Sequence, residues 1–331
     1  MFFNYDDQRI RYTGRWGEEK DQCGNKEGCI TTTAVGAYFE FAFEGEYTVL
    51  RFDVISQSVG VPHLWICVDG GAKMESVVMP YIRVQTAQGG IHTVCVIVKC
   101  ANELLQRWYT PIVSCVRLRG VEADSIIPLP ADERKTIEFV GDSITEGVSL
   151  DEKYRTDGIE ALDRLYRNDI CASYSWLTAE KLNFRPIIMG YGAVGVTHGG
   201  NGGVPKAQAA YPYNFGNSPI NYPEPDYVII NHGANDADAT KDIYCRGYRK
   251  LLDTIRCVHP NSKIIAMAAL CGAHTEALEK LIIAYNSESK ADIIFIDTNG
   301  WIPKEPLHPQ RGGHRVVAEK LAEALTNILQ Q

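Results

Sequence analysis

The 331-residue chain has no run of about 20 consecutive apolar residues, the length that a helix needs to cross a bilayer. Its opening segment, Met1 to Asp7, lacks the basic start and the apolar run of roughly 7 to 15 residues that mark a secretory signal. We therefore expect no membrane association and interpret the chain as cytoplasmic.

An excess of positive charge is also missing. The chain carries 33 lysines and arginines against 41 aspartates and glutamates, a formal net charge of -8. No general positive field would attract nucleic-acid phosphates or anionic lipids. We expect neither nucleic acid nor membrane as a partner, and self-association is compatible with the sequence.

The cysteines show no zinc-binding pattern. Ten cysteines are scattered from Cys23 to Cys271, and the Cys23 and Cys29 pair has no second pair at zinc-ligand spacing. Several, such as Cys67 and Cys95, lie within apolar runs. The pattern predicts buried free thiols in a reducing compartment, and no metal site.

Strand signals dominate the first 130 residues. Short segments there alternate apolar with polar residues or are rich in β-branched residues, and glycine-containing turns separate them. The clearest segments are 36–43, 47–54, 63–68 and 92–98. We predict that residues 1–130 form an antiparallel, jelly-roll-like β-sandwich.

A different pattern occupies residues 131–331, after a short proline-containing stretch. Apolar runs alternate with helix-length amphipathic segments, which is typical of a parallel sheet covered by helices on both faces. The runs are 137–140, 186–189, 227–231, 263–269 and 293–296, and the helical segments are 172–182, 241–258, 275–286 and 313–329. This three-layer α/β/α domain should carry its chemistry at the carboxyl ends of the strands.

Two residues at opposite ends of this domain could perform nucleophilic catalysis. Ser143 follows the first apolar run directly, so its hydroxyl should lie at the carboxyl edge of the sheet, although this serine could instead cap a helix. His308 lies after the last run and before the C-terminal helix. A histidine there can reach the same edge and accept the proton of Ser143.

Two further loops could bind an oxyanion. The glycines of segment 190–195 allow a backbone N–H to approach a ligand closely, and Asn235 could present its side-chain amide. Each such donor is worth about 3 to 4 kcal/mol to a transition state. Taken separately, each loop could equally be a structural turn.

The four loops occur in the order and with the residues of the SGNH (GDSL) hydrolase family, which residues 135–331 resemble. The matching blocks are Gly141-Asp142-Ser143, Gly192 to Gly195, Gly233-Ala234-Asn235-Asp236, and the block around His308. The resemblance implies that Ser143 is the nucleophile and His308 the base. It also implies an oxyanion hole made by Ser143, Gly195 and Asn235, with no metal or organic cofactor.

The sequence departs from that family at one position. Glu305 stands three residues before His308, where the family usually has an aspartate. A glutamate can orient an imidazole as an aspartate does, with a side chain one methylene longer. Asp297 or a backbone carbonyl are alternatives for this role, and Glu305 could be an ordinary exposed loop residue.

The sandwich and the segment Arg11 to Trp16 together resemble the family-two carbohydrate esterases, which remove acetyl groups from sugars and xylan-type oligosaccharides. Aromatic rings stack on sugar rings, and we expect Trp301 and Tyr191 to contact substrate. Packing of the loops is the alternative role for both side chains.

These features predict a serine esterase that acts on a small-molecule or oligosaccharide acetyl ester, in the manner of an acetylxylan esterase. Two alternatives remain. One is a general short-chain esterase or lipase-like hydrolase, and the other is a non-catalytic carbohydrate-binding protein.

Overall fold

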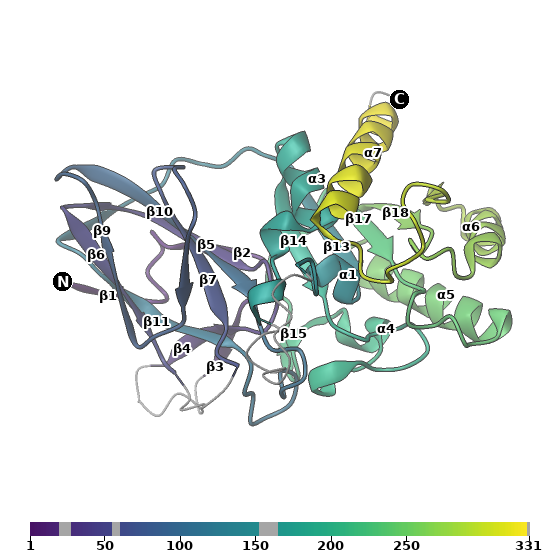
Figure 1. Cartoon of the computed structure of the whole chain (residues 1–331), viewed down its shortest axis with the longest axis horizontal. Coiled ribbons are helices and arrows are strands. Elements are labelled where there is room, and N and C mark those ends of the chain that lie inside the picture. Colours follow the sequence, from purple (N-terminus) through teal and green to yellow (C-terminus); the bar gives the residue numbers. More distant parts are fainter. Residues whose placement is uncertain (20–27, 55–59, 152–164, 330–331) are drawn as a thin grey trace.

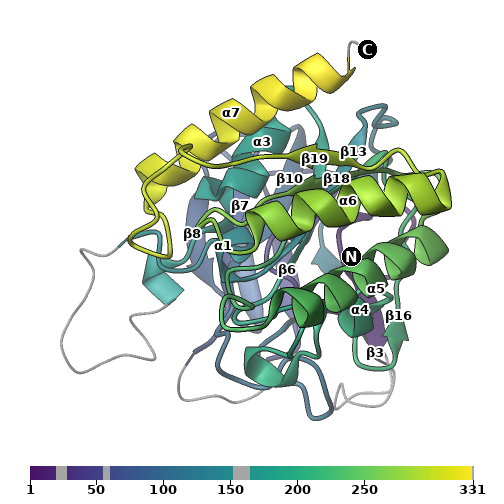
Figure 2. The ribbon, with the colours of Figure 1, turned by 90° about the vertical axis from the view of Figure 1, so that its right-hand side faces the viewer.

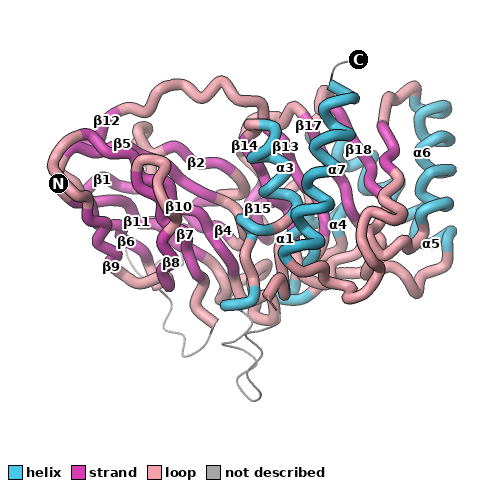
Figure 3. Tube along the Cα trace, turned by 45° about the horizontal axis from the view of Figure 1, so that its top comes forward, coloured by secondary structure: helices cyan, strands magenta, loops and turns pink. Residues whose placement is uncertain are grey.

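The computed structural model describes residues 1–19, 28–54, 60–151 and 165–329. The chain builds two different halves, which lie side by side (Figure 1). In the half that contains the N-terminus, the described residues form strands and no α-helix, whereas helices and strands together form the other half (Figure 3). The predicted change of pattern along the sequence is therefore seen in the structure.

Two six-stranded antiparallel sheets form the first half, as predicted. The first has the order β3-β4-β11-β6-β9, with β1 paired to β11, and its strands are β1 (Phe2–Asn4), β3 (Gly17–Glu19), β4 (Cys29–Thr32), β6 (Tyr47–Phe52), β9 (Tyr81–Gln85) and β11 (Val116–Glu122). The second has the order β12-β5-β10-β7-β8, with β2 paired to β5, and its strands are β2 (Arg11–Thr13), β5 (Tyr38–Glu44), β7 (His63–Val68), β8 (Met74–Val77), β10 (Ile91–Cys100) and β12 (Ser125–Ile127). Alternate residues Phe39, Phe41 and Phe43 of β5 are buried in the core.

A five-stranded parallel sheet is the centre of the second half, also as predicted. Its order is β14-β13-β17-β18-β19, and the strands are β13 (Thr136–Gly141), β14 (Arg185–Gly190), β17 (Tyr227–Asn231), β18 (Lys263–Met267) and β19 (Ile294–Ile296). Since β14 lies on one side of β13 and all later strands lie on the other, the direction of strand addition reverses at β13. Ligand sites of such sheets lie at the carboxyl ends of the strands beside this reversal.

Helices cover both faces of the parallel sheet (Figure 2). In β13, Ile137 and Phe139 point into the core shared with α3 and α7, whereas Val140 points into the core shared with α5 and α6. This alternation explains why the strands read as continuous apolar runs. The helices are α1 (Ser143–Glu146), α3 (Tyr174–Leu182), α4 (Ala207–Ala210), α5 (Lys241–Val258), α6 (Thr275–Ser289) and α7 (Arg311–Leu329), with the 3-10 turns η2 (Ile170–Ala172) and η3 (Asn201–Gly203) and a small hairpin of β15 (Tyr213–Phe215) and β16 (Ser218–Pro219).

Buried ion pairs join the two halves. The guanidinium of Arg15 donates to Glu138 of β13 at 2.7 Å, and both side chains are fully buried. Arg107 donates to both carboxylate oxygens of Glu146 in α1, at 2.5 and 2.9 Å. A buried charge is tolerated only when it is paired in this way, so the sandwich is fixed firmly against the parallel sheet.

The cysteines correct one prediction. Cys29 is disulfide-bonded, so the expectation that all cysteines are free thiols is wrong. Among the described residues, eight cysteines are free. The prediction that they are buried holds for Cys100, Cys115 and Cys171, whereas Cys67 and Cys95 are partly buried and Cys257 is exposed. The sequence did not separate these cases because burial and pairing depend on contacts between distant segments.

Within the described residues, no helix combines the length and the apolar character needed to span a bilayer.

Candidate active site

Ser143 lies at the first position of α1, immediately after β13. Asp142 has extended backbone angles and caps the helix, with its carboxylate accepting the Ile144 N–H at 2.9 Å. Asp142, and not Ser143, is therefore the helix cap. This leaves the Ser143 hydroxyl available for chemistry. A Cβ at Gly141 would overlap Thr145 Oγ1 and lie 2.9 Å from the carbonyl oxygen of Asn231, so only glycine allows this tight turn.

His308 lies in the loop between β19 and α7. Its Nε2 is 2.8 Å from Ser143 Oγ, although the two residues are 165 positions apart in the chain. The distance is that of a hydrogen bond, and an imidazole nitrogen so placed can take the hydroxyl proton as the oxygen attacks an electrophile. The structure thus brings the predicted nucleophile and base together.

Asn235 approaches this pair from the loop after β17. Its side-chain amide donates to Asp142 Oδ2 at 3.2 Å and to the Val194 carbonyl at 3.1 Å, which fixes the amide beside the nucleophile's turn. Ser143 occupies a helix N-terminus, where backbone N–H groups lack acceptors within the helix. The contribution of these N–H groups and of the Asn235 amide to an oxyanion hole stays a prediction, and the amide would have to exchange one of its two present acceptors for the oxyanion.

Gly195 lies in the loop after β14. Its N–H donates to the His198 carbonyl at 3.2 Å, near the long limit of a hydrogen bond. A Cβ at Gly195 would lie 2.5 Å from Asp236 Oδ1, so a larger residue could not occupy this position without displacing the carboxylate. Its role as an oxyanion donor also stays a prediction.

Three polar side chains that were not predicted hold these loops in place. Burial raises the pKa of Asp142 to about 7; the Ile144 N–H opposes this rise, and the Asp236 carboxylate adds to it. Asp236 is buried and accepts hydrogen bonds from the N–H groups of Val196 and Thr197 at 3.1 and 2.9 Å. Both aspartates stand next to predicted site residues in the chain, and that adjacency was the available signal.

His198 is the third of these side chains and connects the two oxyanion-hole loops. Its Nε2 lies 2.8 Å from the Asn235 carbonyl, and its Nδ1 lies 2.8 Å from the Gly199 carbonyl. Both nitrogens can donate together only when the ring is protonated. These two carbonyls accordingly raise the pKa of His198.

The structure places the candidates for the third catalytic residue on the surface. Glu305 is exposed. Asp297 is exposed too, and its carboxylate accepts the Asn299 N–H at 2.9 Å. The identity of the group that orients the His308 imidazole therefore stays a prediction, and the exposure of Glu305 and Asp297 does not support either of them.

The two aromatic candidates differ in burial. Trp301 is half-buried and packs against the core beneath α7, so a substrate contact stays a prediction. Tyr191 is 1% exposed, its hydroxyl lies 3.1 Å from Thr33 Oγ1, and its ring packs edge-on against Trp108. The expectation that Tyr191 stacks on a sugar does not fit this position, because the sandwich covers the ring.

Ser143 and His308 are in contact at the carboxyl edge of the parallel sheet, and no group of side chains suited to bind a metal occurs among the described residues. Residues 139–316 match the GDSL-like lipase/acylhydrolase family, and the chain belongs to this family. No curated protein matches the chain in sequence.

Solved structures share the whole two-part architecture. A family two carbohydrate esterase from Cellvibrio japonicus matches with a TM-score of 0.78 at 18% identity, over 100% of this chain and 98% of that one. A family two carbohydrate esterase from Clostridium thermocellum in complex with cellohexaose matches at 0.76 and 20%, over 97% and 99%. The acetyl xylan esterase Est2A from Butyrivibrio proteoclasticus matches at 0.75 and 17%, over 100% and 99%. At these identities the likeness concerns the fold.

Proposed function

We propose that this GDSL-type hydrolase is an esterase that removes acetyl groups from acetylated carbohydrates. The observation that carries the proposal is the hydrogen bond of 2.8 Å between Ser143 and His308 at the sheet edge. The choice of substrate rests on the likeness of both halves to carbohydrate esterases, one of which is named for acetyl xylan.

The reaction would proceed through an acyl-enzyme. Ser143 Oγ attacks the ester carbonyl carbon while His308 Nε2 takes the hydroxyl proton. The resulting oxyanion accepts from the Ser143 N–H, the Gly195 N–H and the Asn235 amide, the last two exchanging a present carbonyl or carboxylate acceptor for it. This reaction needs no metal or organic cofactor. The bond between the carbonyl carbon and the sugar oxygen then breaks as His308 gives its proton to that oxygen, which leaves an acetylated Ser143. Water, deprotonated by the same imidazole, attacks this ester, and His308 returns the proton to Ser143 Oγ as acetate departs.

A general short-chain esterase is the second candidate, because the same pair of residues would cleave any ester that reaches it. The two candidates are separated by initial rates on acetylated xylo-oligosaccharides, 4-nitrophenyl acetate and 4-nitrophenyl butyrate. The proposal expects kcat/KM to be highest for the acetylated saccharide and lowest for the butyryl ester. Equal rates on acetyl and butyryl esters, with no gain from the sugar, would favour the general esterase.

A non-catalytic carbohydrate-binding protein is the third reading of the sequence. It requires a native protein that binds xylo-oligosaccharides in calorimetry and releases no acid from any of these esters.

A cytoplasmic location stays a prediction: the eight free cysteines fit a reducing compartment, whereas the disulfide at Cys29 fits an oxidising one.

A further inference from the structure

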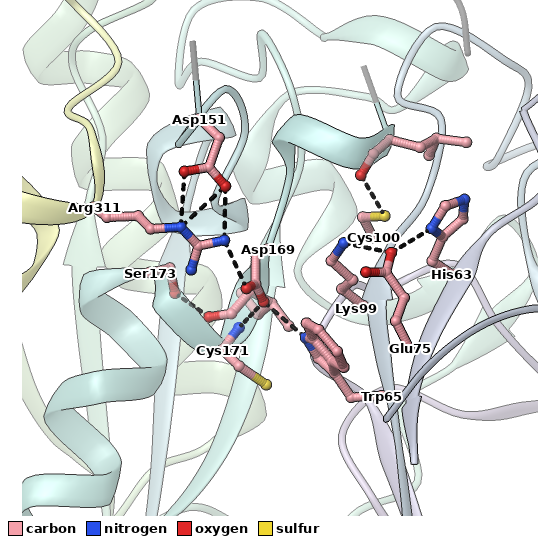
Figure 4. A network of polar contacts seen from close by, with 12 residues as sticks. His63, Trp65, Glu75, Lys99, Cys100, Asp151, Asp169, Cys171, Ser173 and Arg311 are labelled. Carbon is pink, nitrogen blue, oxygen red and sulfur yellow. Dashed lines mark hydrogen bonds and ion pairs between the residues drawn. The ribbon is translucent and has the colours of Figure 1, made fainter. Parts of the chain in front are cut away.

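A network of polar contacts connects the sandwich, through Asp169, to Arg311 and Asp151 (Figure 4). Its centre is Asp169, which directly precedes η2 and is 4% exposed. One carboxylate oxygen accepts the indole N–H of Trp65 at 2.9 Å and the Cys171 N–H at 3.0 Å. Trp65 belongs to β7 of the sandwich, so this contact crosses between the two halves.

The other carboxylate oxygen of Asp169 faces the histidine segment. It accepts from Arg311 Nη2 at 3.1 Å, and the same guanidinium makes three contacts of 2.7 to 3.0 Å with Asp151. Arg311 is the first residue of α7 and stands three residues after His308. Asp169 therefore holds the first residue of α7 in place, and with it the end of the loop that carries His308.

The backbone of Asp169 reaches the nucleophile's helix. Its N–H donates to the Gly147 carbonyl at 3.0 Å, and Gly147 ends α1, which begins with Ser143. A Cβ at Gly147 would lie 2.9 Å from the Asp169 carbonyl oxygen, so the two segments are in close contact. One residue thus contacts the end of the Ser143 helix, the start of the His308 helix and the sandwich.

We propose that Asp169 is a positioning residue that sets the distance between Ser143 and His308, and that Trp65 makes the sandwich part of this arrangement. The inference rests on the proposed function, because it concerns the same serine and histidine. Buried charged hydrogen bonds are strong and directional, and small errors in the placement of reacting groups are costly in rate. The sandwich then takes part in catalysis without touching substrate.

Asp169→Asn tests the proposal, since the amide oxygen can still accept from Trp65 and Cys171 while the amide NH2 faces the Arg311 guanidinium. We expect kcat for 4-nitrophenyl acetate to fall about tenfold or more, with KM changed by less than about twofold. Trp65→Phe, which removes the indole N–H together with part of the ring, should lower kcat about threefold. In the double variant Asp169→Asn/Arg311→Gln, kcat should be no lower than in the worse of the two single variants.

Glu180→Gln is the matched control. Glu180 accepts the indole N–H of Trp176 at 2.8 Å and pairs with Lys73 of the sandwich at 3.3 Å, and in the described part of the chain it has no polar contact with either catalytic segment. The variant should keep the native kcat and KM. An equal loss of kcat in Glu180→Gln and Asp169→Asn would overturn the proposal, because any carboxylate contact between the halves would then have the same effect.

The rate at which a fluorophosphonate labels the serine separates this inference from the proposed function. A native protein that is labelled at Ser143, with Asp169→Asn labelled about tenfold more slowly, supports positioning whatever the natural substrate is. Equal labelling rates and equal kcat in the two proteins would overturn it. Should Asp169→Asn fail to fold, Trp65→Phe and Arg311→Lys decide by the same two readouts. A native protein that is never labelled contradicts the proposed function itself.

Discussion

At the scale of single residues, the proposed reaction makes a specific demand on the side-chain amide of Asn235, which is expected to donate to the oxyanion. We expect Asn235→Ala to lower kcat by about 10² to 10³, equivalent to about 3 to 4 kcal/mol, since the transition state loses one preorganised donor. KM should change little because the ground-state carbonyl carries less charge than the oxyanion. Steady-state kinetics on 4-nitrophenyl acetate measure both constants.

Asn286→Ala is a suitable control for Asn235→Ala. The Asn286 amide also donates to a backbone carbonyl, that of Ile293 at 2.8 Å, but between α6 and the segment before β19. This variant should lose stability and keep its kcat. A normal kcat in folded Asn235→Ala would remove the amide from the oxyanion hole.

Asp142 gives a prediction for pH. The folded protein raises the pKa of this carboxyl from 3.8 to about 7, so the folded chain holds the proton more tightly than the unfolded chain does. The stability that this group contributes is therefore complete below pH of about 4 and is lost as the pH rises through about 7. In Asp142→Asn, the free energy of unfolding should fall less between pH 4 and pH 8 than in the native protein. Urea titrations at the two pH values measure this difference, and identical falls would contradict it.

At the scale of elements, the turn between β13 and α1 depends on a glycine without a side chain. Gly141→Ala introduces a Cβ that overlaps Thr145, so we expect a loss of about 1 to 3 kcal/mol from overpacking and a loss of activity from displacement of Ser143. Gly312 of α7 is the control, because nothing lies within 4 Å of a Cβ built there. Gly312→Ala should be neutral or stabilise the helix by about 0.5 to 1 kcal/mol. Thermal unfolding compares the two, and a stable, active Gly141→Ala protein would show that the turn has room.

The elements themselves were predictable because burial leaves a direct mark on the sequence. Strands β17 and β18 are covered on both faces and read as apolar runs, and the amphipathic segment of α5 has the predicted bounds Lys241–Val258. The start of α7 at Arg311 rather than at residue 313 depends on its contacts with Asp151 and Asp169, which lie far away in the chain.

The site was predictable only in part, for the same reason. Ser143 and His308 follow strands, and parallel strands bring their carboxyl ends to one edge, which explains their contact. The burial of Tyr191 depends on a loop of the sandwich around Trp108, and no local pattern announces it. The support from Asp236 and His198 likewise arises between loops that are separate in sequence.

At the scale of the whole molecule, the buried pairs Arg15–Glu138 and Arg107–Glu146 predict that the two halves unfold together. Arg15→Met leaves a buried carboxylate without its cation and should cost about 3 to 5 kcal/mol. Differential scanning calorimetry should show a single unfolding transition for the native protein and a single transition at a lower temperature for this variant.

The control for this stability prediction is Lys280→Met. Lys280 pairs with Glu276 at 2.6 Å on the surface of α6, where solvent screens an ion pair and its contribution to stability is small. Two well-separated transitions in the native protein would contradict the coupling of the halves.

The most direct test of the central claim is acetate release from acetylated xylo-oligosaccharides by the native protein, Ser143→Ala and His308→Ala. Because nucleophile and base act as one unit, we expect each substitution to reduce kcat by several orders of magnitude, and the double variant to be no worse than either single one. Retained turnover in Ser143→Ala, or a native protein that binds these saccharides and releases no acetate, would contradict the assignment of a serine acetyl esterase.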